Sequence, residues 1–358
     1  MLRSAMITAV ALVASPALGG PHHDDLVSRV VFGSCFRQDD PAPIWAAIGA
    51  ADPDLLIMLG DNVYADTTDM DEMRADYAKL GAVPEFARLL GSGRVLATWD
   101  DHDYGENDAG REYPMREASK EVFLDFFGEP EGTERRTTPG IYDAVTFGPE
   151  GRRVQVILLD TRYFRTELVR GYERGPEGSG LWGRYLPQTA PGSTMLGDEQ
   201  WDWLEDRLRE PADLRILCSS IQLVSEDHAW EAWATMPRER ERMLRLIRKT
   251  GAEGVVVISG DRHRADLSRY DHRLAERGEG VRLDYPLYDL TSSSLNASFA
   301  NWGNEINRYR VGNQYFATNF GSIEIDWGAE EPTVSLRLHA EDGSVVIRRD
   351  VPLDELSR

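Results

Sequence analysis

Hydrophobic and polar positions in the first hundred residues follow two alternating patterns. Apolar runs of strand length are separated by longer stretches in which apolar residues recur every three or four positions, as on one face of a helix. Strands are predicted at residues 30–35, 55–59 and 94–99, and helices at 42–51, 69–80 and 85–90. This order favours parallel strands joined by right-handed crossovers.

The same patterns continue through the middle of the chain, where a hairpin and more helices are expected. Strands are predicted at residues 141–147, 153–159, 214–219 and 254–260, and helices at 116–127, 198–209 and 237–249. The stretch 165–196 is rich in Gly, Pro and Arg and has no periodicity. A loop of this length is either a lid or substrate-contact surface, or a plain surface insertion, and the sequence leaves both open.

Helical periodicity stops near Leu267. Short β-type runs follow at residues 287–290, 321–327, 333–339 and 344–349. We expect these runs to form a second, antiparallel sheet. No repeat or linker divides the chain, so a single α/β domain with two stacked sheets is predicted from residue 21 to residue 358.

The first twenty residues are expected to be a cleaved export signal. Arg3 precedes an apolar run from Ala5 to Ala14, and small residues at 15–19 offer a cleavage site. The run is too short for a permanent anchor, and no later stretch is long and apolar enough to span a membrane. The sequence therefore predicts an exported protein, periplasmic or secreted, without a transmembrane anchor.

The net charge limits the possible binding partners, and the two cysteines raise the question of a disulfide. The formal net charge of −21 disfavours binding to nucleic acid, sequence-specific or not. An acidic protein that handles an anionic substrate needs a local positive centre, which bound metal ions supply. A disulfide between Cys35 and Cys218 is an alternative, but both fall in predicted core strands of a chain large enough to fold without one.

Polar side chains stand where four of the predicted strands end. The carboxyl ends of parallel strands meet along one edge of a sheet, which is where ligands bind in open α/β folds. Carboxylate, phenol, imidazole and thiol groups together suit a transition metal, and the tyrosine and cysteine anions favour ferric iron. The candidates are Cys35, Asp61, Tyr64, Asp101, His102, Asp261 and His263.

Simpler explanations exist for several of these residues. Asp61 could cap the next helix, Tyr64 could be a core aromatic, and His102 could be a hydrogen-bonded core histidine. The paired Cys/His spacing of a zinc finger and the Gly-x-Ser-x-Gly elbow of many hydrolases are absent from the sequence. A hydrolase that uses the serine run 292–294 as nucleophile stays open as an alternative, and its activity would survive chelators.

Seven short motifs, in order along the chain, carry a family resemblance. They are GSC, GDNVY, WDDHDYG, LLDTRYFR, SSIQLV, HAWEAW and SGDRH. Together they resemble the alkaline phosphatase D (PhoD-like) family of metallophosphoesterases over about residues 29–296. The resemblance implies a calcineurin-like α/β sandwich of two mixed β-sheets flanked by helices, and a site where two metal ions promote phosphate ester hydrolysis.

The resemblance also implies roles for the first group of ligands. Cys35 stands where other metallophosphoesterases have their first Asp, and Asp61 resembles the carboxylate that bridges two metals. The spacing from Asp61 to Tyr64 resembles the iron–phenolate pair of purple acid phosphatases.

Two matching positions carry carboxylates in place of the usual ligands. Asp101 replaces an Asn, and Asp261 replaces the first His of a His-x-His pair that ends at His263. Asn107 could add an amide oxygen, but no His follows the strand that ends near Cys218, so the second ion's ligand set stays open. Oxygen-rich ligands favour calcium. The implied cofactors are two or more ions, Fe³⁺ with Ca²⁺, with Mn²⁺ or Zn²⁺ as alternatives.

Other residues are candidates for catalysis and substrate binding. His102 would stabilise or protonate the leaving oxygen, with Asp103 orienting its ring. Arg162 could hold a phosphate oxygen bidentately, although a structural salt bridge would show the same pattern. Asn62 and His228 are further substrate-binding candidates, and His228 could instead cap a turn.

The combined expectation is an exported, metal-dependent phosphohydrolase that cleaves phosphomonoesters, phosphodiesters or both by metal-activated water. The expected substrate is a small phosphate ester: a nucleotide, a phospholipid or a cell-envelope phosphodiester. A non-catalytic metal- or phosphate-binding protein with a degenerate site is the alternative from another class. His272 and His339 lie outside the pattern and are interpreted as surface residues.

Overall fold

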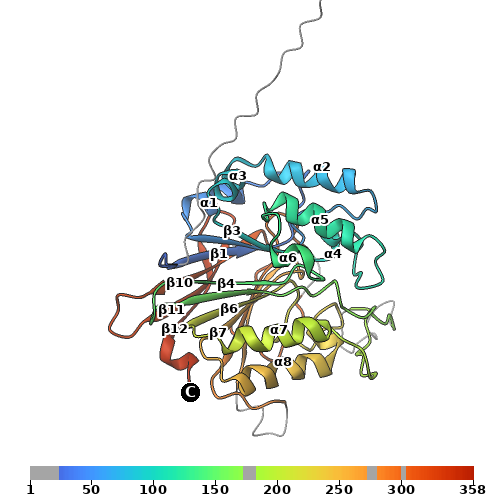
Figure 1. Cartoon of the computed structure of the whole chain (residues 1–358). Helices are drawn as coiled ribbons and strands as arrows, with labels where there is room; N and C mark the ends of the chain where they lie inside the picture. Colours follow the sequence, from blue (N-terminus) through green and yellow to red (C-terminus); the bar gives the residue numbers. More distant parts are fainter. Residues whose placement is uncertain (1–23, 172–182, 272–279, 300–303) are drawn as a thin grey trace, which may run out of the picture.

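A computed structural model describes residues 24–171, 183–271, 280–299 and 304–358. Two six-stranded β-sheets form the middle of the molecule, and helices cover their outer faces (Figure 1). This is the mixed α/β sandwich that the sequence predicts. The expected export signal at residues 1–20 lies outside the described residues.

The first sheet has the strand order β12-β11-β10-β1-β2-β3. Its parallel half contains β1 (Arg29–Gly33), β2 (Leu55–Leu59) and β3 (Val95–Thr98). Its antiparallel half contains β10 (Asn319–Asp326), β11 (Thr333–Ala340) and β12 (Val345–Pro352). The two halves join where β10 pairs antiparallel with β1. The predicted parallel start of the chain is confirmed.

The second sheet has the order β4-β5-β6-β7-β9-β8. Its strands are β4 (Asp143–Phe147), β5 (Val154–Leu158), β6 (Leu214–Ser219), β7 (Val255–Ser259), β8 (Ala265–Tyr270) and β9 (Leu287–Ser292). The inner four are parallel, while β4 and β8 are antiparallel edges. The predicted hairpin between β4 and β5 is confirmed.

The predicted sheet membership of the last strands is wrong. Strand β9 lies parallel to β7 in the second sheet, whereas β10, β11 and β12 extend the first sheet from β1. The β1–β10 pairing joins Val31 to Ser322, and local periodicity carries no information about such a distant partner. Strand β8 is absent from the sequence prediction because its ADLSRY stretch mixes apolar and polar residues without a long hydrophobic run.

Side chains along β1 and β2 alternate between two hydrophobic cores. Val30, Phe32 and Ile57 belong to the core shared with the second sheet. Val31 and Met58 belong to the core beneath the helices of the first sheet. Period-two alternation of strand side chains explains this division. Beyond the exposed Arg29 at the start of β1, both faces are buried, so the polar residues of the predicted site come after the strands end.

In the described part of the chain, six helices cover the two sheets. Helices α1 (Ile44–Ala50), α2 (Met70–Gly81), α3 (Pro84–Gly91) and α5 (Arg116–Phe126) lie over the first sheet, and α7 (Gly197–Arg209) and α8 (Pro237–Thr250) over the second (Figure 1). Short turns of helix are α4 (Asp101–Tyr104), α6 (Glu134–Thr137), η1 (Trp233–Thr235) and η2 (Leu353–Leu356). Asp69 caps α2, because its side chain accepts from the N–H groups of Asp71 and Glu72.

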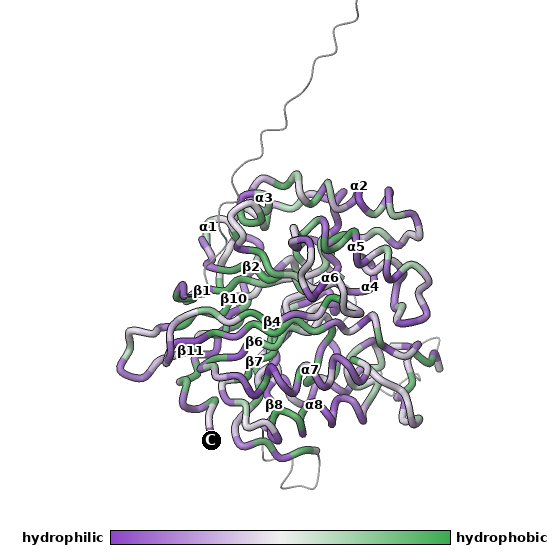
Figure 2. Tube along the Cα trace, viewed as in Figure 1, coloured by the Kyte–Doolittle hydropathy of each residue, from purple (hydrophilic) through white to green (hydrophobic). Residues whose placement is uncertain are grey.

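Hydropathy follows this layering. The central strands are hydrophobic, whereas the covering helices alternate between hydrophobic and hydrophilic residues (Figure 2). Within the described ranges, every helix is too short or too polar to cross a lipid bilayer.

Candidate metal centre

The loops that follow β1, β2 and β7 contain residues in an unusual backbone conformation. Cys35, Asp61, Asp261 and His263 have φ angles of 59°, 50°, 63° and 54°. Residues other than glycine rarely adopt this left-handed conformation, and those that do concentrate at functional sites. All four are among the ligands predicted from the sequence, which makes this edge of the sheets the candidate site.

A first group of donors forms around Asp61. One ligand atom from each of Cys35, Asp61 and His263 lies within 4.8 Å of the others, and all three residues are buried. The Cys35 Sγ and the Tyr64 hydroxyl are 3.2 and 3.3 Å from Asp61 Oδ2. His263 Nδ1 meets the Ala297 carbonyl, which leaves Nε2 as the ring atom for a metal. The fold thus brings four predicted ligands together.

Two further groups of donors continue from the first. Asp61, Asp101 and His102 offer ligand atoms within 4.8 Å of one another, and so do Asp101, Asp108 and Glu231. Because Asp61 and Asp101 each belong to two groups, the three groups form a continuous series of donors, which we call the donor series. This arrangement can hold more than one cation.

Buried oxygens that lack hydrogen-bond partners, on Asp61 in the donor series and on two residues beside it, fit a site for metal ions. Among the described residues, Asp61 Oδ1, Asn62 Oδ1 and Asp261 Oδ2 have no such partner. Leaving a buried polar atom unpaired costs about 1–3 kcal/mol. Burial also raises the pKa of Asp61 and of Asp261 well above the usual range; Asp101 adds repulsion to Asp61, and Arg262 only partly offsets the effect at Asp261. Bound cations would remove both costs.

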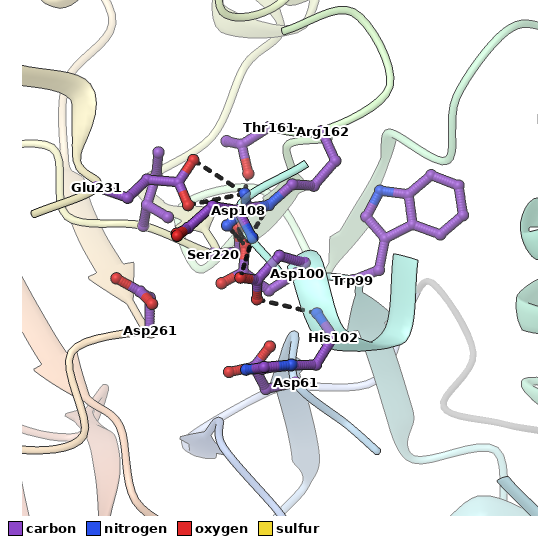
Figure 3. Close-up of polar contacts among 12 residues, drawn as sticks. Asp61, Trp99, Asp100, His102, Asp108, Thr161, Arg162, Ser220, Glu231 and Asp261 are labelled. Carbon is purple, nitrogen blue, oxygen red and sulfur yellow. Dashed lines mark hydrogen bonds and ion pairs between the residues drawn. The ribbon is translucent and has the colours of Figure 1, made fainter. Parts of the chain in front are cut away.

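Arg162, a predicted phosphate-binding residue, is enclosed by carboxylates (Figure 3). Its Nε lies 2.7 Å from Asp100 Oδ1, and its Nη1 lies 2.9 Å from Glu231 Oε1. Arg165 pairs with the same Glu231 at 3.1 Å. The side chain of Arg162 is 0% exposed. The structure therefore places Arg162 as a buried link between the end of β5 and the end of β3.

The ring of His102 meets Asp66, which no sequence pattern marks. His102 Nδ1 lies 2.7 Å from Asp66 Oδ2. Asp103, predicted to orient this ring, instead accepts from the backbone N–H groups of Asp61 at 3.1 Å and Asp100 at 2.7 Å. Burial raises the pKa of Asp103 to about 7, while the Asp100 N–H favours the charged form. Asp103 therefore fixes the turn that presents Asp61.

The remaining predicted residues lie as follows. Asn62 donates its side-chain amide to a carbonyl at the end of β3, at 2.9 Å. Asn107 is exposed, and the adjacent Asp108 supplies the carboxylate of the third donor group. His228 is buried, with Nε2 2.9 Å from Gln222 Oε1. Burial lowers the pKa of His228 to about 4, so this ring is neutral at pH 7.

Part of the long loop at 165–196 reaches the donor series. The Tyr185 hydroxyl donates to Asp108, and Gly183 forms a β-bridge with Ala229, two residues before Glu231. Residues 172–182 lie outside the described part of the chain. The described end of this loop is thus a contact surface for the site.

Both cysteines are free, which excludes the disulfide alternative. Cys35 belongs to the first donor group, while Cys218 lies in β6 within the hydrophobic core. Local signals existed for two of the residues that the sequence reasoning missed: Asp108 follows Asn107, and Glu231 lies inside the HAWEAW motif. Asp66 had no such signal.

Comparisons with known proteins identify the family. The family model of the PhoD-like phosphatases matches residues 30–336. Alkaline phosphatase D of Bacillus subtilis (strain 168) is 25% identical over 186 residues, which are 47% of this chain and 30% of that protein. The chain is thus matched over less than a third of the length of this curated relative.

Two solved structures share the fold. The structure of PhoD has a TM-score of 0.61 at 17% identity, over 93% of this chain and 73% of that one. GAP50, the anchor in the inner membrane complex of Plasmodium, has a TM-score of 0.55 at 12% identity, over 92% of this chain and 89% of that one. The family model spans most of the sequence, and the chain belongs to the PhoD-like phosphatase family, a family of hydrolases that act on phosphoric esters.

Proposed function

We propose that this protein is a metal-dependent phosphohydrolase that cleaves phosphomonoesters, phosphodiesters or both. The observation that carries the proposal is the donor series together with Tyr64, where thiol, phenol, imidazole and carboxylate groups converge and buried oxygens lack hydrogen-bond partners. Family membership supports the same reaction class.

The donor types suggest which ions the site holds. Cys35 and Tyr64 offer anionic sulfur and phenolate ligands, which suit Fe³⁺. Asp101 and Asp108 offer oxygen ligands, which suit Ca²⁺, with Mn²⁺ or Zn²⁺ as alternatives. When bound, such cations polarise the phosphoryl oxygens and lower the pKa of a coordinated water.

His102 is the proposed proton donor to the leaving oxygen. Its Nδ1 is held by Asp66, so Nε2 is left for the substrate or for a neighbouring carboxylate. Burial opposes protonation, but Asp101, Asp61 and Asp66 outweigh it and raise the pKa of His102 to about 11. Bound cations would offset the charges of Asp61 and Asp101, bringing this pKa closer to the working range of a general acid.

Arg37 is the proposed cation for the substrate phosphate. It is exposed, and its guanidinium lies over the Tyr64 ring, 5.2 Å from the centroid. Its backbone is held by Asn296, whose side chain accepts from the Arg37 N–H at 2.7 Å and donates to the Arg37 carbonyl at 2.9 Å. Among the described residues, no carboxylate forms an ion pair with its guanidinium. Arg37 is therefore open to a phosphate oxygen, whereas Arg162 is not.

The proposal is tested by metal analysis and by hydrolysis assays on the purified protein. We expect at least two bound ions per chain and turnover of 4-nitrophenyl phosphate, bis(4-nitrophenyl) phosphate or both. Chelation should abolish turnover, and added metal should restore it. Bound metal without hydrolysis over a broad panel of esters and pH values would instead support the non-catalytic alternative. Activity that survives complete metal removal would favour a serine nucleophile.

Export is a further proposal that depends on residues 1–20 alone. Expression with the full N-terminus in a bacterial host should yield a secreted or periplasmic protein that begins near residue 21, as measured by intact mass. A cell-associated product that retains Met1 would contradict it.

A further inference from the structure

Ser293 is the one member of the 292–294 serine run whose hydroxyl lies between two candidate metal ligands. Its Oγ is 3.0 Å from Cys35 Sγ and 2.6 Å from the backbone nitrogen of His263. Ser293 is fully buried, directly after β9 in the second sheet, whereas Cys35 follows β1 in the first. The hydroxyl therefore joins ligand loops from both sheets.

We propose that Ser293 is a positioning residue whose hydroxyl donates a hydrogen bond to the metal-bound sulfur of Cys35 and thereby sets how much charge that sulfur passes to its metal. The inference rests on the proposed function, because it takes Cys35 to be a metal ligand. It concerns a residue outside the donor series itself.

The direction of the hydrogen bond follows from counting hydrogens. A backbone N–H can only donate, so the contact with His263 uses a lone pair of Ser293 Oγ. The hydroxyl keeps its single hydrogen, and Cys35 Sγ lies at donating distance. A thiolate bound to metal carries no hydrogen and can only accept. The Ser293 hydrogen therefore points to the sulfur.

Ser34 is the competing donor, and its geometry is less suitable. Its Oγ is 3.5 Å from Cys35 Sγ, against 3.0 Å for Ser293. Ser34 also has a carbonyl acceptor, because its Oγ donates to the Ser292 oxygen at 3.3 Å. With its one hydrogen directed there, Ser34 serves as a matched control: a buried hydroxyl next to the same sulfur with a different acceptor.

Backbone contacts hold Ser293 in place without its hydroxyl. Its N–H donates to the Arg264 carbonyl at 3.1 Å. The next two N–H groups, of Ser294 and Leu295, donate to the Ser34 carbonyl at 3.2 and 2.9 Å. These bonds tie the end of β9 to the β1 loop. We therefore expect Ser293→Ala to fold, so that a change at the metal can be separated from a loss of structure.

The hydrogen bond from Ser293 changes how the sulfur of Cys35 shares its electrons with the metal. A hydrogen bond to a thiolate stabilises its lone pairs, so less charge passes to the metal, and such contacts tune sulfur-ligated metal sites. Removing the donor raises the energy of the sulfur electrons. The energy of sulfur-to-metal charge transfer then falls, and the absorption moves to longer wavelength. This role also gives the serine run a structural purpose other than nucleophilic attack.

The experiment uses the full chain loaded with Co²⁺ alone, because Co²⁺–thiolate charge transfer gives an absorption band in the near ultraviolet. We expect this band in the wild type and its loss in Cys35→Ser. In Ser293→Ala the band should move to longer wavelength, because the sulfur then passes more charge to the metal. In Ser293→Thr, which keeps the hydroxyl, and in Ser34→Ala, the band should stay at its wild-type wavelength. Circular dichroism confirms that each variant is folded.

The possible failures are distinct. If the wild type lacks the band, or Cys35→Ser keeps it, Cys35 is not a ligand and the proposed metal centre is at fault. If the wild-type band is present but Ser293→Ala leaves its position unchanged, the inference about Ser293 is overturned while the metal centre stands. An equal shift in Ser34→Ala would also overturn it, because the effect would not be specific to the Ser293 donor.

Discussion

His102 and Asp66 form a pair in which one residue is enclosed and the other faces solvent. The side chain of His102 is 15% exposed, and that of Asp66 is 42% exposed. Because Asp66 contributes little buried surface, its replacement should alter the orientation of the His102 ring more than the stability of the fold. Substitutions in this pair can therefore separate an effect on catalysis from an effect on folding stability.

Replacing His102 with Gln should slow hydrolysis most for esters with poor leaving groups. For an alkyl phosphate we expect kcat to fall by roughly 10²–10⁴-fold, the usual contribution of a general acid. Asp66→Asn should cause a smaller loss in the same direction. A 4-nitrophenyl ester, whose leaving group needs little protonation, should lose less in both variants. Steady-state kinetics on the two esters measures this difference.

Asp69→Asn is the matched control for Asp66→Asn. Asp69 lies three residues further along the same loop and caps α2, and Asn caps helices as well as Asp does. Its kinetics should equal those of the wild type. Equal losses on both esters in Asp66→Asn, or a loss in Asp69→Asn, would argue against a proton-donating role for His102.

At the scale of single residues, the sequence predicts many of the candidate metal ligands but not the residues that their side chains contact. A polar residue directly after a hydrophobic strand is visible in the sequence, which is how Cys35, Asp61 and His263 were identified. The neighbour of a side chain depends on the path of other loops. Arg162 therefore lies among buried carboxylates, and the contact of His102 with Asp66 had no sequence signal.

Strand β11 contains a buried histidine, His339, which the sequence reasoning wrongly placed on the surface. His339 is 8% exposed. Its Nε2 lies 2.8 Å from the Ser322 hydroxyl, its Nδ1 lies 3.1 Å from the Gly343 carbonyl, and its ring stacks on Phe320. A single histidine outside any motif gives no sign of burial. Its neighbours come from β10 and from the turn before β12.

His339 should make the free energy of unfolding depend on pH. Burial lowers the pKa of His339 below the usual histidine value of about 6.5, with the Gly343 carbonyl acting in the opposite direction. The unfolded chain therefore binds more protons below pH 6.5, so the contribution of His339 is complete above that pH and is lost as the pH falls. Urea titrations between pH 7.5 and 5 should show a smaller decrease in His339→Gln than in the wild type. Equal decreases would contradict the assignment.

Elements defined by local patterns were predicted well, and those defined by distant pairing were not. The run LLIML marks β2 by itself, and Asp69 marks the start of α2. The antiparallel attachment of β10 to β1 joins two segments that lie far apart in the sequence. Nothing within the β10 sequence distinguishes that edge from an edge of the second sheet.

In the whole molecule, the buried contacts of Arg162 connect the two sheets beside the donor series. Asp100 follows β3 of the first sheet, and Arg162 follows β5 of the second. Both side chains, and that of Glu231, are at most 2% exposed. Removing the cation would leave buried carboxylates without compensation, which is far more costly than losing a surface ion pair.

Arg162→Met should lower the free energy of unfolding by about 3–5 kcal/mol. The control is Arg245→Met, which breaks the exposed ion pair with Glu241 in α8 and should cost less than about 1 kcal/mol. Urea denaturation of the two variants measures both values. A small effect in Arg162→Met, together with a large rise in KM, would show that Arg162 binds substrate instead.

Asp61 belongs to two of the three donor groups, so its replacement tests the central claim most directly. Asp61→Asn should reduce the metal content per chain and lower kcat for phosphate ester hydrolysis by at least about a hundredfold. Asp71→Asn, whose side chain is 93% exposed on α2, should keep wild-type values of both. Elemental analysis and turnover are measured on the same samples. Unchanged metal content and turnover in Asp61→Asn would contradict the account.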